Sequence, residues 1–453
     1  PGVPLTRSFN RRKKMNLIYG IKDKPKFGQI ILFSIQQLLA IMAATIAVPA
    51  IVGNGLTASA ALFGAGVGTF VYLLFTKSSS PVFLGSSFAF IGSMFSAFGG
   101  AASVTIGYWG LIIGALMAGL VYVILAVIVK LCGVKWIDKL MPPVIIGPTV
   151  SIIGLSLSAN AVSDLMKSSV EGGNTKIALL CGLITLAVTM LCSTYGKKIG
   201  RLIPFIIGIL AGYLTASIFA LIGTAANNPA LVVINYDALK NVTGLFALPK
   251  FTFLMGGAEG LKGITGTYLL TIAAAYIPVA FVVFAEHLAD HKNLSSIIGT
   301  DLLKEPGLTR TLLGDGIGTM VSTLFGGCPN TTYGESIGCV AITRNASTIS
   351  IWGCAILCIL FSLISPLVAF LETIPSCVMG GVCIALYGFI AVSGFKMFQQ
   401  VDLNKNRNLF VASVIFITGV GGMVVSFGAV EIRTVACALI LGILTNVMLG
   451  KEE

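Results

Sequence analysis

Residues 326–338 read GGCPNTTYGESIG, a polar and helix-breaking stretch between two long apolar runs. Glycine and proline disfavour continued helix, so part of the backbone here is expected to be extended. The stretch also contains a carboxylate, Glu335, with apolar sequence on both sides. What this interruption does depends on whether water or lipid surrounds the apolar runs.

The composition of the chain indicates a lipid environment. Of the 453 residues, 56% are hydrophobic and only 10% are charged, and the mean hydropathy is +0.96. A soluble protein carries about 25% charged residues, so we expect an all-α polytopic membrane protein. Most of the ten cysteines lie in apolar runs, and we expect them to be buried small side chains rather than disulfides.

Fourteen apolar segments are candidates for membrane spans. A helix needs about 20 apolar residues to cross a bilayer. The segments lie near residues 28–50, 57–76, 84–99, 106–131, 142–162, 176–195, 201–223, 264–288, 308–326, 334–344, 348–371, 376–397, 407–425 and 430–449. Two of them, 84–99 and 334–344, are too short to cross as complete helices.

The distribution of basic residues gives the expected orientation. With the N-terminus inside, the predicted inner loops hold about four times as many Lys and Arg residues as the outer loops, as the positive-inside rule requires. The net charge of +12 is therefore an orientation signal and does not indicate a nucleic-acid partner. We expect a multi-pass protein of the plasma membrane with both termini in the cytoplasm.

The two short segments occupy matching positions in two halves of the chain. If the halves divide within the outer loop at 224–262, seven segments lie on each side, and the second half is inverted. Interrupted segments at matching positions of inverted halves mark the midplane site of a transporter. We expect the helix ends near GSSFAF (85–90) and GESIG (334–338) to offer N–H donors to a polar solute.

Three acidic residues lie within the predicted spans, namely Glu286, Asp315 and Glu335. A charged side chain inside a bilayer is costly, so these residues are candidates for function. Phe88 adds an aromatic face on which a planar ligand could stack. The sequence has no phosphate-binding loop and no recognisable nucleophile–base arrangement, so we expect neither ATP-driven transport nor an enzyme.

The two histidines, His287 and His291, stand four residues apart, as zinc ligands on a helix do. A metalloprotease helix requires glutamate directly after the first histidine, whereas the order here is EHLADH. No third ligand stands at the spacing of a zinc site. We expect no metal site, and we place His291 at the cytoplasmic end of its helix.

The run PGLTRTLLGDGIGTMVSTLFGGCPNTTYGESIGCVAITR (306–344) resembles the signature region of the nucleobase–ascorbate transporters, also called nucleobase:cation symporter-2. Within that family it is most similar to the bacterial uracil permease branch. QQLLAIMAATIAVPAIVG (36–53), LGSSFAFI (84–91) and PSCVMGGVCIALYGFIAVSG (375–394) match in the same order. The family motif corresponds here to the ten residues that start at Glu335, except that Ser336 stands where the motif has Asn.

The resemblance implies two inverted repeats of seven segments, at 27–223 and 263–450. They would be joined by an extracytoplasmic loop at 224–262 and preceded by a cytoplasmic segment at 1–26. Short antiparallel strands would precede the half-helices of segments 3 and 10. Segments 1–4 and 8–11 would form a core domain and segments 5–7 and 12–14 a gate domain, in a homodimer.

The resemblance also implies the roles of individual residues. Positions that bind or surround the substrate in the family are matched by Glu286, Glu335, Phe88, Gly334, Tyr333, Ala44 and Tyr387. Among them Glu286 and Glu335 are the acids, and the backbone at Gly334 and Phe88 supplies amide donors. Proton coupling is implied for Glu286, Asp315 and Asp290, the last of which stands where a uracil permease of the family has His.

These residue types suit uracil, a flat ring with two N–H donors and two carbonyl acceptors. Two carboxylates accept from the N–H groups and backbone amides donate to the carbonyls, whereas unpaired polar groups would cost several kcal/mol. Burial disfavours the charged form of a carboxylate, so Glu286 could take up a proton outside and release it inside. We expect proton–uracil symport by alternating access, driven by the proton gradient and without a cofactor.

Two other functions remain open at this point. Asp315 matches an acid of the purine transporters in the family, so a permease for xanthine, guanine or another purine base is the first alternative. An anion channel or exchanger of the related sulfate-transporter fold is the second, although such proteins lack the acid pair. Coupling to sodium rather than protons also stays open.

Overall fold

The computed structural model describes residues 16–134, 136, 141–197, 199–399, 401–427 and 430–450. The first fifteen residues of the segment predicted at 1–26 lie outside these ranges. The first half contains α1 (Phe27–Val52), α2 (Ala58–Phe75), β1 (Leu84–Ser86), η2 (Phe88–Phe90), α3 (Ile91–Gly99), α4 (Val104–Cys132), α6 (Pro143–Ser156), α7 (Ser158–Leu165), α8 (Thr175–Tyr195), α9 (Ile199–Leu202) and α10 (Pro204–Ala225).

The remaining elements begin in the long connection after α10. They are η3 (Pro229–Leu231), α11 (Asp237–Lys240), α12 (Thr252–Lys262), α13 (Gly266–Ile298), η4 (Leu303–Gly307), α14 (Leu308–Gly326), β2 (Asn330–Thr332), α15 (Gly334–Thr343), α16 (Thr348–Ser362), α17 (Ser365–Glu372), α18 (Ser376–Phe398), α19 (Asn406–Val420), β3 (Val425–Phe427), β4 (Val430–Ile432) and α20 (Thr434–Met448). The loop predicted at 224–262 therefore carries three short helices of its own.

Helical structure lies at each of the predicted segments, in four of them as two successive helices. Within the described ranges, eight helices are long and apolar enough to cross a membrane by length and composition, and four further apolar helices are shorter. The ten cysteines are free thiols, and most of them are buried. The chain thus has the helix content and the apolar surfaces of a protein that crosses a bilayer several times.

The helix α13 is longer than the sequence analysis predicts, because it continues past residue 288 to Ile298. Leu288, His291, Leu294 and Ile298 follow one another at intervals of three and four residues and are all buried, so the extension has an apolar face of its own. Gly299 ends the helix in the left-handed conformation. The placement of His291 at a helix end was wrong: it lies inside α13 and is fully buried.

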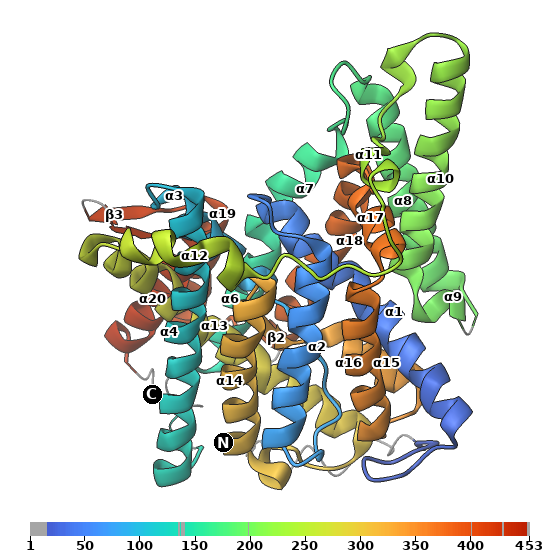
Figure 1. Ribbon diagram of the computed structural model, residues 1–453. Helices are drawn as coiled ribbons and strands as arrows, with labels where there is room; N and C mark the ends of the chain where they lie inside the picture. Colours follow the sequence, from blue (N-terminus) through green and yellow to red (C-terminus); the bar gives the residue numbers. More distant parts are fainter. Residues whose placement is uncertain are drawn as a thin grey trace.

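The helices pack in two groups. In the first group α14 packs against α2 and α4, α16 against α1 and α2, and α13 against α3 and α4. In the second group α18 packs against α6, α7 and α8, α10 packs against α8, and α19 and α20 pack against α6. In the view of Figure 1, α8 and α10 stand at the upper right, and α2, α4 and α14 occupy the centre and left.

A short antiparallel pair of strands crosses the first group. β1 pairs with β2 in the register Leu84 with Thr332, Gly85 with Thr331 and Ser86 with Asn330, and both strands are buried. Extended backbone at membrane depth must satisfy its hydrogen bonds within the protein, and this ladder does so. Because the strands are antiparallel, η2 and α15 begin at opposite ends of the ladder.

Candidate functional site

Two short helices begin directly after the strand pair. α15 starts at Gly334 and η2 at Phe88, and neither has a side chain that caps its first turn. The first N–H groups of a helix have no intrahelical partner. Together with the positive end of the helix dipole, they are available to a polar or anionic group that lies in front of the helix.

A cavity of about 340 Å³ lies in front of these helix ends. On one side its walls come from the first group of helices, through η2, α13 and the segment from Thr331 to Glu335. On the other side they come from the second group, through α6, α8, α9, α10 and α18. The cavity therefore lies between the two groups, and both contribute to its lining.

Three carboxylates line this cavity. Glu286 and Asp290 stand one turn apart on α13, on the same face of the helix, and Glu335 lies in the first turn of α15. Thr332 on β2 donates its hydroxyl proton to Asp290 Oδ2 at 2.6 Å. The position of Asp290 is thus set by the strand pair, and Glu335 lies at the helix end where N–H donors are free.

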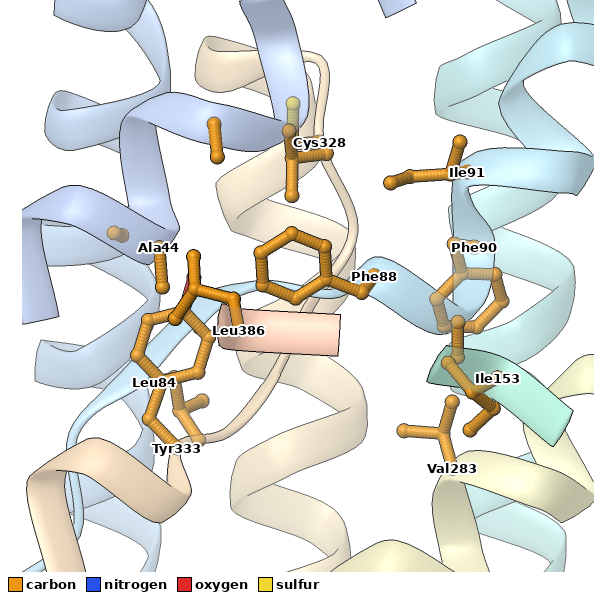
Figure 2. Close-up of a cluster of buried hydrophobic side chains, with 14 of the residues drawn as sticks. Ala44, Leu84, Phe88, Phe90, Ile91, Ile153, Val283, Cys328, Tyr333 and Leu386 are labelled. Carbon is orange, nitrogen blue, oxygen red and sulfur yellow. The ribbon is translucent and has the colours of Figure 1, made fainter. Parts of the chain in front are cut away.

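The aromatic residues form part of the wall and its support. Phe88 lines the cavity, and its ring meets the ring of Tyr387 edge to face at a centroid distance of 5.6 Å. Figure 2 shows the ring of Phe88 pointing from η2 toward Leu386, with Tyr333 below it. Tyr333 also lines the cavity, and its hydroxyl donates to the carbonyl oxygen of Ser86 at 2.8 Å.

The other predicted site residues are distributed between the wall and the layer behind it. Gly334 is among the residues that line the cavity. Ala44 and Tyr387 are buried in the surrounding apolar core rather than in the lining. Ala44 belongs to α1 and Tyr387 to α18, so they back the wall from the two different groups of helices.

Asp315 does not lie at the cavity. It is buried on α14, and its Oδ2 atom is 2.7 Å from Nδ1 of His287 on α13. His287 faces away from the cavity acids because it lies next to Glu286 in the helix, about 100° around the axis. The predicted proton-coupling residues are therefore divided, with Glu286 and Asp290 at the cavity and Asp315 in a separate polar cluster.

Ser336, which stands where the family motif has Asn, connects three parts of the site. Its side chain is fully buried. Its Oγ atom accepts a hydrogen bond from Nε2 of Gln37 on α1 and another, 3.2 Å long, from the backbone N–H of Phe83. The hydroxyl thus joins the start of α15 to α1 and to the segment that leads into β1.

Sequence reasoning did not single out Thr332, which holds Asp290, or Arg201 of α9, which lines the cavity. It considered His287 only as a metal ligand, whereas the structure pairs His287 with Asp315. The run NTTYGE contained the only usable signal for Thr332, a hydroxyl two residues before the start of a short helix. Within the described ranges, no group of three His, Cys, Asp or Glu residues could hold a metal ion.

Comparisons with known proteins place the chain in a family. The sequence model described as "Permease family" matches residues 28–427. The uracil permease of Bacillus subtilis (strain 168) is 38% identical over 452 residues, which cover 98% of this chain and 97% of the relative. The uracil permease of Escherichia coli (strain K12) is 36% identical over 428 residues, which cover 94% and 92%.

Two solved structures share the fold. The transmembrane domain of the cyanobacterial bicarbonate transporter BicA has a TM-score of 0.59 and 16% identity, with 94% of this chain and 99% of that chain covered. The murine Slc26a9 anion transporter in the inward-facing state has a TM-score of 0.63 and 11% identity, with 94% and 69% covered. At such low identity the likeness concerns the fold alone. The family match and the apolar helices show that the chain is a multi-pass membrane protein that belongs to the permease family and is a transporter rather than an enzyme.

Proposed function

We propose that the protein is a secondary-active uracil importer that moves uracil together with protons. Relatives that span nearly the whole chain at 38% and 36% identity are uracil permeases. The observation that carries the proposal is that Glu286 and Glu335 line one cavity together with the start of α15. This arrangement brings two carboxylate acceptors and free backbone donors to one small space.

The chemistry of the cavity suits a flat ring with alternating donors and acceptors. Glu286 and Glu335 would accept from the two N–H groups of uracil, and the backbone N–H groups at Gly334 and Phe88 would donate to its carbonyls. The ring of Phe88 supplies an aromatic surface beside them. A ring that lacks one of these groups leaves a buried polar atom unpaired, at a cost of about 1–3 kcal/mol.

The packing of the helices supports an alternating-access mechanism. We assign the first group of helices to a core domain and the second to a gate domain, with the cavity between them. The eight long apolar helices, the less apolar α14 and the shorter α3, α15, α16, α19 and α20 would together supply fourteen segments in two inverted repeats of seven. Movement of one domain against the other would open the cavity to one side of the membrane at a time. We further propose a homodimer in the plasma membrane with both termini in the cytoplasm.

Proton coupling is assigned to Glu286, Asp290 and Asp315, with the proton gradient as the driving force and no cofactor. A charged carboxylate that crosses the membrane plane without a partner is costly, and a protonated one is not. Each proton that binds together with the neutral base would therefore remove one buried negative charge from the loaded core before it moves.

Uptake of labelled uracil into proteoliposomes with an imposed pH gradient, acidic outside, tests the proposal. The wild-type protein should accumulate uracil, and Glu286→Gln should abolish that accumulation because Gln cannot exchange a proton. Glu259→Gln, an exposed residue of α12, is the matched control and should behave as wild type. Absence of uracil uptake by the wild type, or accumulation by Glu286→Gln at the wild-type rate, would overturn the proposal.

A purine permease is the second candidate, and it rests on the presence of Asp315. Because Asp315 lies outside the cavity lining, it offers a bound base no direct contact. Uracil should therefore compete best in a panel of uracil, xanthine and guanine against labelled uracil. Stronger competition by xanthine or guanine would favour the purine candidate.

A further inference from the structure

A second buried polar cluster lies behind α13, on the side away from the cavity. His287 and Asp315, here called the dyad, are 0% and 1% exposed, and they contact each other through Nδ1 and Oδ2 at 2.7 Å. The other ring nitrogen, His287 Nε2, is 3.0 Å from the hydroxyl of Thr311 on α14. No ligand-binding role explains this cluster, because neither member of the dyad lines the cavity.

Thr311 has two hydrogen-bond partners but only one proton to donate. Its Oγ1 atom is 3.0 Å from His287 Nε2 and 3.1 Å from the carbonyl oxygen of Leu308. The carbonyl can only accept, whereas the ring nitrogen can either accept or donate. The orientation of the Thr311 hydroxyl therefore depends on whether His287 Nε2 carries a proton.

Two protonation states fit the same positions of the heavy atoms. In the empty state, Nδ1–H of a neutral His287 donates to the carboxylate of Asp315, and Thr311 donates to Nε2. The dyad then carries one negative charge. In the loaded state one proton has been added at Nε2, which now donates to Thr311, while Thr311 turns its own proton to Leu308. The loaded dyad is an ion pair with no net charge, and every proton is accounted for.

We propose that the dyad is a proton-binding site of the transport cycle, distinct from the substrate cavity. The hydroxyl of Thr311 turns when the dyad takes up its proton. This inference rests on the proposed proton-coupled transport and assigns part of the coupling to a place that uracil does not touch. Thr311 acts through His287 and is a positioning residue.

The surroundings of the dyad support a site that changes its charge. Asp315 Oδ1 has no hydrogen-bond partner within the described residues, so an excess negative charge there is poorly stabilised and a proton is favoured. The rings of His287 and His291 stack at a centroid distance of 4.0 Å. The titratable groups around the dyad are Glu286, Asp290 and His291 on α13, Tyr72 on α2 and Tyr122 on α4.

Neighbouring groups also restrict where the proton can go. His291 holds its own proton on Nδ1, because that atom is 2.8 Å from the carbonyl oxygen of His287, which can only accept. Its Nε2 atom is 2.7 Å from the hydroxyl of Tyr72, which also contacts Ser80 at 2.7 Å. Glu286 precedes His287 directly in α13, so the charge of the dyad acts on a cavity acid through a short distance in a medium of low dielectric constant.

Three variants and one control test the inference. Asp315→Asn keeps a polar group of the same size but cannot form the ion pair. Thr311→Val keeps the shape of the side chain but removes the hydroxyl, whereas Thr311→Ser keeps the hydroxyl. Thr323→Val is the matched control, because Thr323 is a buried residue of α14 whose hydroxyl donates only to the carbonyl of Thr319 in its own helix.

Two measurements separate coupling from a structural role. Exchange of labelled uracil across the membrane at equal pH reports binding and movement of the protein. Accumulation under a pH gradient reports proton coupling. Asp315→Asn should keep exchange within about twofold of wild type. It should lower the accumulation ratio by up to about tenfold for each pH unit of the gradient, because that is the most that one linked proton contributes. Thr311→Val should move the pH of half-maximal uptake down by about one unit. The variant removes the hydroxyl from both states, but the loaded state loses more, because a hydrogen bond to the charged imidazolium is stronger than one to the neutral ring.

The outcomes distinguish this inference from the proposed function. Rescue of the pH profile by Thr311→Ser, with an unchanged profile in Thr323→Val, supports the dyad. The proposed proton-binding role of the dyad is wrong if Asp315→Asn accumulates uracil like the wild type or if Thr311→Val has a wild-type pH profile. Either result leaves the proposal of proton–uracil symport intact. If the wild-type protein itself shows no proton-driven uracil accumulation, the proposed function fails and the inference fails with it.

Discussion

The hydroxyl of Ser336 offers the sharpest test of how the site is held together. It accepts hydrogen bonds from Gln37 Nε2 and from the backbone N–H of Phe83, and all three groups are buried. Ser336→Ala removes the acceptor and leaves two buried donors unpaired, at about 1–3 kcal/mol for each donor. The expected loss of stability is therefore about 2–6 kcal/mol.

The loss can be measured by thermal unfolding of the purified protein. With an unfolding entropy of about 2.1 cal/mol/K per residue, each kcal/mol corresponds to about 1 °C in Tm for a chain of 453 residues, so Tm should fall by about 2–6 °C. Because Glu335 is the neighbouring residue, uracil should also bind more weakly to Ser336→Ala. Ser336→Asn, which restores the family motif, should keep an acceptor for at least one of the donors. It should therefore lose less stability and less uracil affinity than Ser336→Ala.

Ser322→Ala is the control for this prediction. Ser322 is fully buried on α14, but its hydroxyl only donates to the carbonyl of Thr319, so its removal leaves no donor unpaired. Ser322→Ala should therefore lower the free energy of unfolding by about 1 kcal/mol or less. If Ser336→Ala matches Ser322→Ala in both Tm and uracil affinity, the assigned role of the two hydrogen bonds is wrong.

Further predictions concern the wall of the cavity and the packing behind it. Phe88→Leu keeps the apolar volume but removes the aromatic face. The Kd for uracil, measured by calorimetry, should therefore rise about twofold to tenfold, equivalent to about 0.5–1.5 kcal/mol. An unchanged Kd would exclude stacking on Phe88. Gly154→Ala should abolish the folded protein in size-exclusion profiles, because a Cβ atom there would collide with the backbone carbonyl of Tyr387 where α6 crosses α18. Gly388→Ala, also on α18, meets nothing within 4 Å and should elute as wild type; equal behaviour of the two variants would contradict the close packing of α6 and α18.

Much of the site was accessible from local sequence patterns, but its geometry was not. The break at GGCPNTTYGESIG and the stretch at 85–90 indicated two short helices with free N-terminal ends, and both helices begin within these stretches, at Gly334 and at Phe88. Hydropathy failed at the end of α13, because the helix continues beyond the apolar run on a narrower buried face that contains His291. A criterion based on average hydropathy does not detect such a face.

The charged residues show the same division. Their presence in apolar sequence was enough to make Glu286, Asp315 and Glu335 candidates for function, because charge in a bilayer is costly wherever it points. Where each of these side chains lies in the fold could be determined only from the packing of the helices. Glu286 and Asp315 looked equivalent in the sequence, yet one lines the cavity and the other pairs with His287 behind α13.

The amino-acid pattern on its own was sufficient for the lipid environment, the positions of the helical segments and the two breaks, since hydropathy and the conformational limits of glycine and proline act over a few neighbouring residues. Three-dimensional packing decided that Glu335 shares a cavity with Glu286, that Thr332 holds Asp290 and that Ser336 joins α15 to α1. These contacts join residues that are tens to hundreds of positions apart. They depend on the rotation and crossing of whole helices, to which the residues between them all contribute.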